Sequence, residues 1–233
     1  AALLAGRRGK HRVGRIDFDD AVDRIMLGSE REDPIGTRER NVVAYHEAGH
    51  ALIARLIPGA DPLRKVTIIP RGRSLGSTQQ VPEEDRHTFE QRYLLGRICV
   101  ALGGRASEQI VFGEPSNGVA NDLKYATQLA RKMVCQWGMS PRLGPMAVNQ
   151  GEEHVFLGRE LAQERDFSER TARVVDEEIQ AILSAMEKRA MTVLNDNREI
   201  LDALARALLD NETLESADVD RLVAERTVEG VPA

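Results

Sequence analysis

The chain has 233 residues, of which 42% are hydrophobic and 30% are charged, as is ordinary for a soluble globular protein. Its net charge of −5 provides no general field that would attract nucleic acid, so we expect no nucleic-acid partner. No apolar run approaches the about 20 residues that a membrane-spanning helix needs. The two cysteines, Cys99 and Cys135, lie in apolar segments and imply buried free thiols rather than a disulfide framework.

The N-terminal residues predict a short helical piece, a basic turn and a second helix with Asp17 as its N-cap. Because the chain starts without Met in what resembles the middle of a helix, we expect it to be cut from a longer protein. The charged stretch 29–36 contains Pro and Gly and predicts a linker. A longer helix follows, capped by Thr37 and ending before the Pro-Gly pair at 58–59.

Two strands are predicted after this helix. Residues 64–70 are rich in β-branched side chains, and residues 74–81 form a second strand interrupted by glycine. Gly76 inside a strand indicates a bulge or the close approach of another backbone. The sequence 88–91 has the form of a capping box and predicts the start of a helix that reaches about residue 112.

The rest of the chain predicts helices. One begins at Asn121 or Asp122, after a loop rich in Pro, Gly, Ser and Asn, and ends near residue 138. Amphipathic patterns predict three more helices, at 168–195, 198–209 and 217–224. The expected fold class is therefore mainly α with a small β-sheet next to the long helix 37–57.

The most informative feature is an H-E-x-x-H motif at residues 46–50, within that long helix. His46 and His50 are one helical turn apart, so both imidazoles lie on one face and reach a single zinc ion at about 2.0–2.1 Å. Glu47 lies beside the metal, which suits a general base acting on zinc-bound water. Gly49 costs a helix interior about 1 kcal/mol relative to Ala, so we expect a contact that requires it.

A catalytic zinc keeps three protein ligands and one open position, so the motif lacks one ligand. Asp122 has the better local argument, because it begins a helix after a glycine-containing loop, although a plain N-cap role would also explain it. Glu108, inside the preceding helix, suits a carboxylate that accepts a hydrogen bond from a ligand imidazole, or a solvated helix charge. His87 and His154 lie in polar, loop-like segments and are weaker candidates.

Taken together, these segments resemble the protease domain of the FtsH family, the membrane-anchored AAA metalloproteases. The resemblance runs over essentially the whole chain. Its matching pieces are 45–51, 66–72, 75–76, 102–106, 121–123, 130–134, 137–140 and 155–159. It departs from the family pattern at Gln109, where a second glutamate is common, and at 116–120, which replaces a threonine-rich loop.

The resemblance implies a zinc-peptidase helical domain of the Asp-zincin type over residues 37–233, with 1–28 as the last part of an AAA helical lid and 29–36 as a linker. It implies that His46, His50 and Asp122 bind one zinc ion and that Glu47 is the catalytic base.

The family further implies an endopeptidase within an ATP-dependent, membrane-tethered homo-hexamer, located at the cytoplasmic face of the bacterial inner membrane. Such an enzyme degrades unfolded and membrane proteins. The 233 residues contain no G-x-x-x-x-G-K-[ST] loop, so ATP is expected only in an AAA module that they lack, and membrane tethering only through segments outside them. We expect the substrate to lie extended along residues 74–80 and to pair main chain to main chain.

Two hypotheses from other classes compete with this one. In the first, the zinc is structural and the chain is an inert adaptor, but a purely structural site has no use for Glu47. In the second, the motif is accidental and the chain is a regulatory helical domain that binds partners. Metal analysis separates the second hypothesis from an enzyme.

Overall fold

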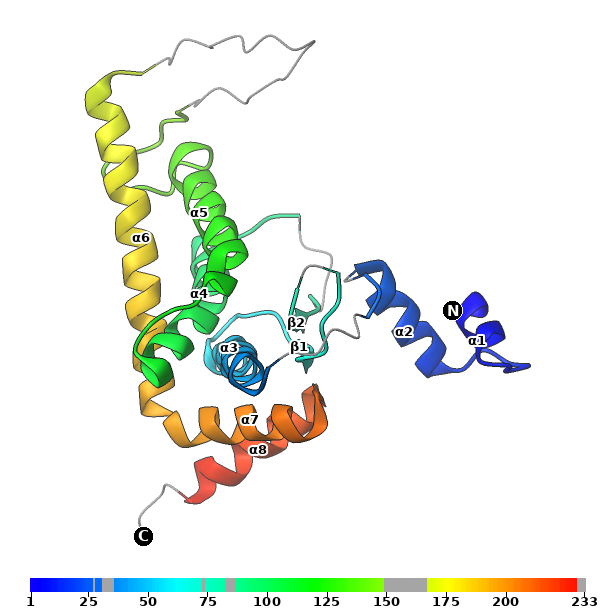
Figure 1. Ribbon diagram of the computed structural model, residues 1–233. Coiled ribbons are helices and arrows are strands. Elements are labelled where there is room, and N and C mark those ends of the chain that lie inside the picture. The colour runs from blue at the N-terminus through cyan, green and yellow to red at the C-terminus, as the bar shows by residue number, and fades with distance from the viewer. Residues whose placement is uncertain (27, 31–35, 73, 83–86, 149–166, 230–233) are drawn as a thin grey trace.

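The computed structural model describes residues 1–26, 28–30, 36–72, 74–82, 87–148 and 167–229. Over these residues the fold is mainly helical with one small sheet, which confirms the predicted fold class (Figure 1). The helices are α1 (Ala2–Arg7), α2 (Arg15–Met26), α3 (Thr37–Leu56), α4 (Gln91–Phe112), η1 (Asn117–Val119), α5 (Ala120–Cys135), α6 (Glu169–Asp196), α7 (Arg198–Asn211) and α8 (Ser216–Glu229). The strands are β1 (Leu63–Thr67), β2 (Ser77–Gln80) and β3 (Thr213–Glu215).

The sheet has the order β2-β1-β3, and β1 pairs antiparallel with both neighbours. Strand β3 lies between α7 and α8 in the chain and was not predicted, because three residues are too short for a periodic signal. It is held by long-range contacts, among them one between the hydroxyls of Thr67 and Thr213 at 2.8 Å. The sheet therefore joins the C-terminal helices to the segment that follows α3.

Helix α3, which carries the H-E-x-x-H motif, lies in the middle of the fold. It packs against α4 and α7 and also contacts β1 (Figure 1). Its second half is apolar because neighbouring elements cover it, and Leu52 and Ile53 are fully buried. The surrounding core has two parts, one around α3, β1, α7 and α8 and one between α4, α5 and α6. Since α4 and α6 contribute to both parts, the motif helix is fixed on several sides.

Several predicted helix starts were wrong by one to three residues. Helix α2 begins at Arg15, and Asp17 lies in its first turn, where its Oδ2 accepts a hydrogen bond from Gly14 N at 2.9 Å. Helix α3 has Gly36 at the N-cap, and Thr37 is its first residue. The capping box at 88–91 does not form, because α4 begins at Gln91 without a side-chain cap. Helix α5 begins at Ala120, which places Asp122 inside its first turn.

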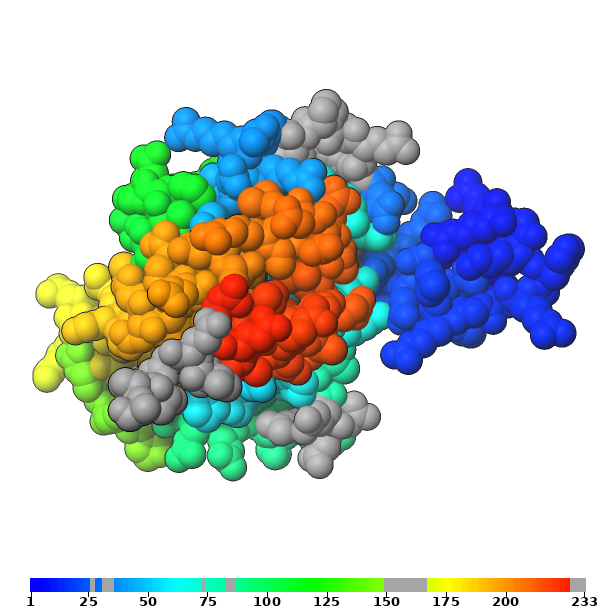
Figure 2. All heavy atoms as spheres, turned by 90° about the horizontal axis from the view of Figure 1, so that it is seen from below, coloured from blue at the N-terminus to red at the C-terminus, as the bar shows by residue number. Residues whose placement is uncertain are grey.

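The starts of the C-terminal helices agree with the prediction within one residue, whereas α7 and α8 extend two and five residues beyond their predicted ends. The hydroxyl of Ser168 caps α6 by accepting from Thr171 N at 3.3 Å. Helices α7 and α8 cover one face of the molecule, as the orange and red atoms of Figure 2 show. No described helix has the length and apolar content that crossing a membrane requires.

Helices α1 and α2 form a pair that projects from the other helices (blue in Figures 1 and 2). Asp17 is fully buried between them, and Lys10 Nζ lies 2.8 Å from its Oδ1. Polar contacts tie α2 to the sheet, including Arg64 to Asp19 at 3.0 Å and the ion pair of Lys65 with Asp23. The predicted boundaries of the lid remnant and the linker stay predictions.

Candidate metal centre

The site begins with a close crossing of α3 over α4. A Cβ added to Gly49 would lie 2.5 Å from the carbonyl oxygen of Gly103 and 2.6 Å from Ser107 Cβ, which no real side chain tolerates. We expected a close contact at Gly49 because glycine is unfavourable inside a helix, and the structure confirms this contact. Gly104, one residue further along α4, lies directly against the motif, since its added Cβ would be 2.5–2.6 Å from ring atoms of His46 and His50. Only glycine lets α4 support both imidazoles in this way.

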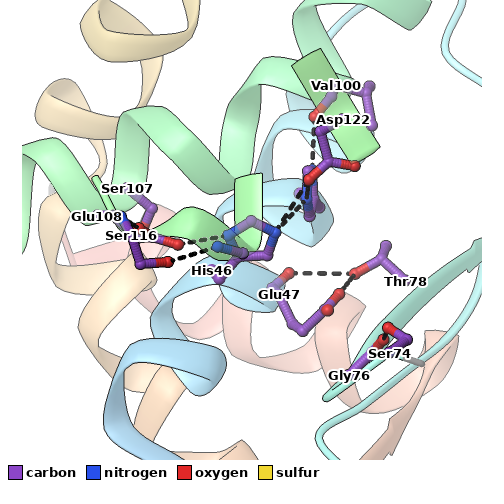
Figure 3. Close-up of polar contacts among 12 residues, drawn as sticks. His46, Glu47, Ser74, Gly76, Thr78, Val100, Ser107, Glu108, Ser116 and Asp122 are labelled. Carbon is purple, nitrogen blue, oxygen red and sulfur yellow. Dashed lines mark hydrogen bonds and ion pairs between the residues drawn. The ribbon is translucent and has the colours of Figure 1, made fainter. Parts of the chain in front are cut away.

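Three candidate ligand atoms converge at one point. The Nε2 atoms of His46 and His50 are 3.0 Å apart, and Oδ2 of Asp122 lies 3.1 Å from the first and 3.4 Å from the second. Ligands about 2.0–2.1 Å from a tetrahedrally coordinated zinc ion are separated by about 3.3 Å. The three residues thus fit a zinc ion, and they form a possible metal-binding group among the described residues (Figure 3).

The other nitrogen of each imidazole has its own acceptor. His46 Nδ1 lies 2.7 Å from Glu108 Oε1, and His50 Nδ1 lies 2.7 Å from the carbonyl oxygen of Val100. A carboxylate and a carbonyl only accept, so each Nδ1 carries a hydrogen, and each Nε2 faces Asp122, where it binds either a proton or a metal ion. This is the tautomer that a metal-binding histidine requires.

Glu108 connects the His46 ring to the backbone at Ser116, in the segment that precedes η1. Its side chain is 1% exposed, and its second oxygen accepts a hydrogen bond from the backbone N–H of Ser116 (Figure 3). Burial opposes its charge, but hydrogen bonds with His46 and Ser116 outweigh burial and lower the pKa of the Glu108 carboxyl. Of the two carboxylates that the sequence left open, Asp122 thus lies at the point of convergence, whereas Glu108 lies behind the ring of His46.

The charges around His46 favour its protonated form as long as no metal is bound. Burial lowers its pKa, but hydrogen bonds with Asp122 and Glu108 outweigh burial and raise the pKa of His46 to about 10. Burial would raise the pKa of Asp122, yet its hydrogen bonds with His46 and His50 hold that pKa well below the usual value. A proton and a metal ion therefore compete for the same site.

Glu47 is 6% exposed and points from α3 toward β2 (Figure 3). Its Oε2 accepts a hydrogen bond from the hydroxyl of Thr78 at 2.7 Å. Gly76 lies against the other carboxylate oxygen, since an added Cβ there would be 2.7 Å from Glu47 Oε1 and 2.9 Å from the carbonyl oxygen of Thr67. The predicted close approach at Gly76 is therefore confirmed, although this glycine precedes β2 rather than interrupting it.

A pocket of about 840 Å³ extends from His46 and Glu47 along the first turns of α3. It lies between the segment 74–76 and the segment around η1. Its apolar lining includes Val42, Val43, Leu75 and Phe112. A pocket of this size and lining has room for an apolar side chain next to the candidate metal site.

Of the two weaker candidates, only His87 lies among the described residues, and it does not join the site. His87 is exposed and is not part of the described metal-binding group, and His154 lies outside the described residues. Sequence reasoning missed the contribution of Thr78, because the contact depends on how β2 approaches α3. It also missed Gly104, for which a signal existed: two adjacent glycines inside a predicted helix are costly and indicate a close contact.

A motif helix with two converging histidines, an aspartate from a later helix and an adjoining pocket of about 840 Å³ are typical of a zinc peptidase. Comparison with known proteins gives the family: residues 34–222 match peptidase family M41, and the chain belongs to this family. Zinc is accordingly its metal cofactor.

Curated relatives agree. The chain is 55% identical over 222 residues to "ATP-dependent zinc metalloprotease FtsH" of Nitrosococcus oceani, covering 95% of this chain and 35% of the relative. It is 49% identical to the protein of the same name from Syntrophotalea carbinolica, over 98% of this chain and 35% of the relative. It is 53% identical to "ATP-dependent zinc metalloprotease FtsH 4" of Sphaerobacter thermophilus, over 92% of this chain and 32% of the relative. The chain thus spans about a third of the length of these relatives.

Proposed function

We propose that this chain is the zinc endopeptidase domain of an ATP-dependent protease, with His46, His50 and Asp122 as the zinc ligands and Glu47 as the general base. The observation that carries the proposal is the convergence of two Nε2 atoms and one carboxylate oxygen within 3.4 Å of each other. Each ring is oriented by an acceptor on its Nδ1, as in metal sites. The family membership supports the same assignment.

The chemistry follows from the placement of these side chains. A bound zinc ion supplies Lewis acidity that polarises a scissile carbonyl and makes water a nucleophile near pH 7. Glu47 takes the proton from the attacking water and delivers it to the leaving amine. The pocket along Val42 and Phe112 holds a substrate side chain and excludes water from the reacting bond. The substrate main chain lies extended along residues 74–80 and pairs with the edge of β2.

The wider assembly is proposed from the relatives, of which the chain covers about a third. Residues 1–28 form the end of an AAA helical lid, 29–36 a linker, and 37–233 the protease domain. The complete protein is a homo-hexamer tethered to the cytoplasmic face of a bacterial inner membrane by segments outside these residues. Its substrates are unfolded and membrane proteins.

The test is degradation of casein by the zinc-loaded protein and by its Glu47→Gln variant. Gln has the shape of Glu but cannot take a proton, and His46 and His50 stay in place. We expect the variant to keep its zinc and to lose proteolysis. A variant with parental zinc content that still degrades casein at a near-parental rate would remove Glu47 from the mechanism. A parent protein that binds zinc and cleaves nothing would favour the adaptor hypothesis.

A further inference from the structure

The contact between Thr78 and Glu47 joins the motif helix to the sheet. Thr78 Oγ1 lies 2.7 Å from Glu47 Oε2 and 3.3 Å from the main-chain oxygen of Glu47. Both oxygens only accept, so Thr78 is the donor, and its single proton goes to the nearer and more strongly accepting carboxylate. Among the described residues, no other hydrogen bond to this carboxylate is present.

The remaining space around Glu47 is small. The backbone of Gly76 occupies one side of the carboxylate so closely that a Cβ would lie 2.7 Å from Oε1 and 2.8 Å from Cγ. Glu47 and Gly76 both line the pocket next to His46, whereas Thr78 is not among the lining residues. The hydroxyl thus fixes Oε2 without itself lining the pocket, and the Glu47 side chain still lines the pocket beside His46.

From this geometry we infer that Thr78 is a positioning residue for hydrolysis: its hydroxyl holds the Glu47 carboxylate in the orientation in which it accepts the proton of the attacking water. The inference rests on the proposed role of Glu47 as general base. A proton acceptor works only within a narrow range of distance and angle, and a displacement of about 1 Å costs on the order of 100-fold in rate. Without the hydroxyl, the buried carboxylate has no fixed donor and rotates about its side-chain bonds.

The location of Thr78 adds a consequence for substrate binding. It lies on β2, the edge strand along which we place the substrate, and its backbone pairs with Val66 of β1. The same strand therefore orders the peptide main chain and orients the base that acts on it. A loss of the hydroxyl removes only the second of these effects, because pairing of the main chain does not use the side chain.

The experiment compares Thr78→Val, which has the shape of threonine without the hydroxyl, with Thr78→Ser, which keeps the hydroxyl. Thr213→Val is the matched control, since it makes the same change on β3, at the edge of the sheet opposite to β2 and outside the segment where we place the substrate. For each zinc-loaded protein, kcat and KM are measured with a short fluorogenic peptide, together with zinc per chain and the midpoint of thermal unfolding. Thr78→Ala serves as a second hydroxyl-free variant if Val perturbs the strand.

We expect Thr78→Val and Thr78→Ala to lower kcat about 10- to 100-fold at unchanged KM, zinc content and unfolding midpoint. We expect Thr78→Ser to stay within about threefold of the parental kcat and Thr213→Val to match the parental kcat. The inference is overturned if both hydroxyl-free variants keep the parental kcat, if serine does not restore it, or if the loss of kcat follows a loss of zinc or of stability. Glu47→Gln is measured alongside: an active Glu47→Gln protein contradicts the proposed function itself, whereas an inactive one with parental Thr78→Val contradicts only the role of Thr78.

Discussion

Gly49 of α3 and Gly103 of α4 meet backbone to backbone, so that a Cβ on Gly49 would lie 2.5 Å from the carbonyl oxygen of Gly103. The contact lets the two helices approach closely at the level of the metal centre. It brings Val100 within reach of His50 and Glu108 within reach of His46, each at 2.7 Å. The orientation of both imidazoles therefore depends on the lack of a side chain at Gly49 and at Gly103.

Gly49→Ala tests this dependence. The added methyl group meets backbone and Ser107 Cβ rather than the end of a flexible side chain, so α3 and α4 must separate. Overpacking lowers the free energy of unfolding by about 1–3 kcal/mol, and the better helix propensity of Ala offsets up to about 1 kcal/mol of this loss. We expect a lower unfolding midpoint and weaker zinc binding. Gly96→Ala is the control on α4, because its Cβ would find only Ile57 Cγ2 at an ordinary 3.6 Å; equal effects of the two substitutions would contradict the argument.

The two carboxylates near His46 differ in what their removal costs. Asp122→Ala reduces three converging ligands to two, so we expect the protein to lose most of its zinc on dialysis against a mild chelator. Glu108→Ala removes the acceptor behind His46 and frees the N–H of Ser116, and we expect affinity to fall about 10- to 100-fold. Zinc per chain is measured by elemental mass spectrometry, with Glu114→Ala at the pocket rim as the control. A larger loss at Glu108 than at Asp122 would reverse the assignment.

Zinc binding should depend on pH through His46. In the metal-free protein the pKa of His46 is raised from 6.5 to about 10, so the ring carries a proton at neutral pH that zinc must displace. Apparent zinc affinity should therefore rise about tenfold per pH unit between pH 7 and 9. Competition with a chelator of known pH dependence measures it. An affinity that is flat over this range would show that His46 is already neutral.

The same shift predicts the stability of the metal-free protein. A folded-state pKa above the unfolded value means that protonation of His46 stabilises the fold, fully below pH 6.5 and progressively less as pH rises toward about 10. Zinc removal should consequently cost more stability at pH 9 than at pH 6.5. Chemical unfolding with and without chelator at the two pH values measures the difference, and the opposite order would contradict the prediction.

A comparison of unfolded and folded substrates tests what the 233 residues cleave without an ATPase module. Unfolding a stable domain costs about 5–15 kcal/mol, and the 233 residues contain no P-loop that would couple ATP to this work. We expect cleavage of a short unstructured peptide and no cleavage of a stable folded domain, with or without ATP. Degradation of the folded domain that increases with ATP would show that an ATPase site was missed.

Local sequence patterns were sufficient to predict the histidine pair, the close contact at Gly49 and the mainly α fold. One-turn spacing placed His46 and His50 together, and the energetic cost of Gly49 correctly indicated a close contact. The mainly α fold followed from apolar periodicity, which is strong in α6 and α7. The choice between Glu108 and Asp122 could not be made from spacing, because both lie on helices whose mutual orientation is set by packing.

The features that sequence reasoning missed are long-range. Strand β3 exists because β1 is beside it, and the Thr78 contact exists because β2 passes α3 at the level of Glu47. The capping box at 88–91 has favourable local chemistry, yet α4 begins at Gln91 without it. For β3 and for Thr78 a partner far away in the sequence decides the structure, and a single local window holds no information about that partner.

Strand β2 is held from both faces at consecutive positions. Thr78 donates to Glu47, whereas Gln79 Nε2 donates to Asp23 Oδ1 of α2 at 3.2 Å, as the alternation of side chains along a strand requires. Asp23 also pairs with Lys65 on β1, so two strands of the sheet are tied to the projecting helical pair. We therefore expect a displacement of that pair to reach β2 at Gln79, one residue away from the partner of Glu47. The helical pair α1–α2 and the Glu47 carboxylate are therefore connected through two neighbouring side chains of β2, Gln79 and Thr78.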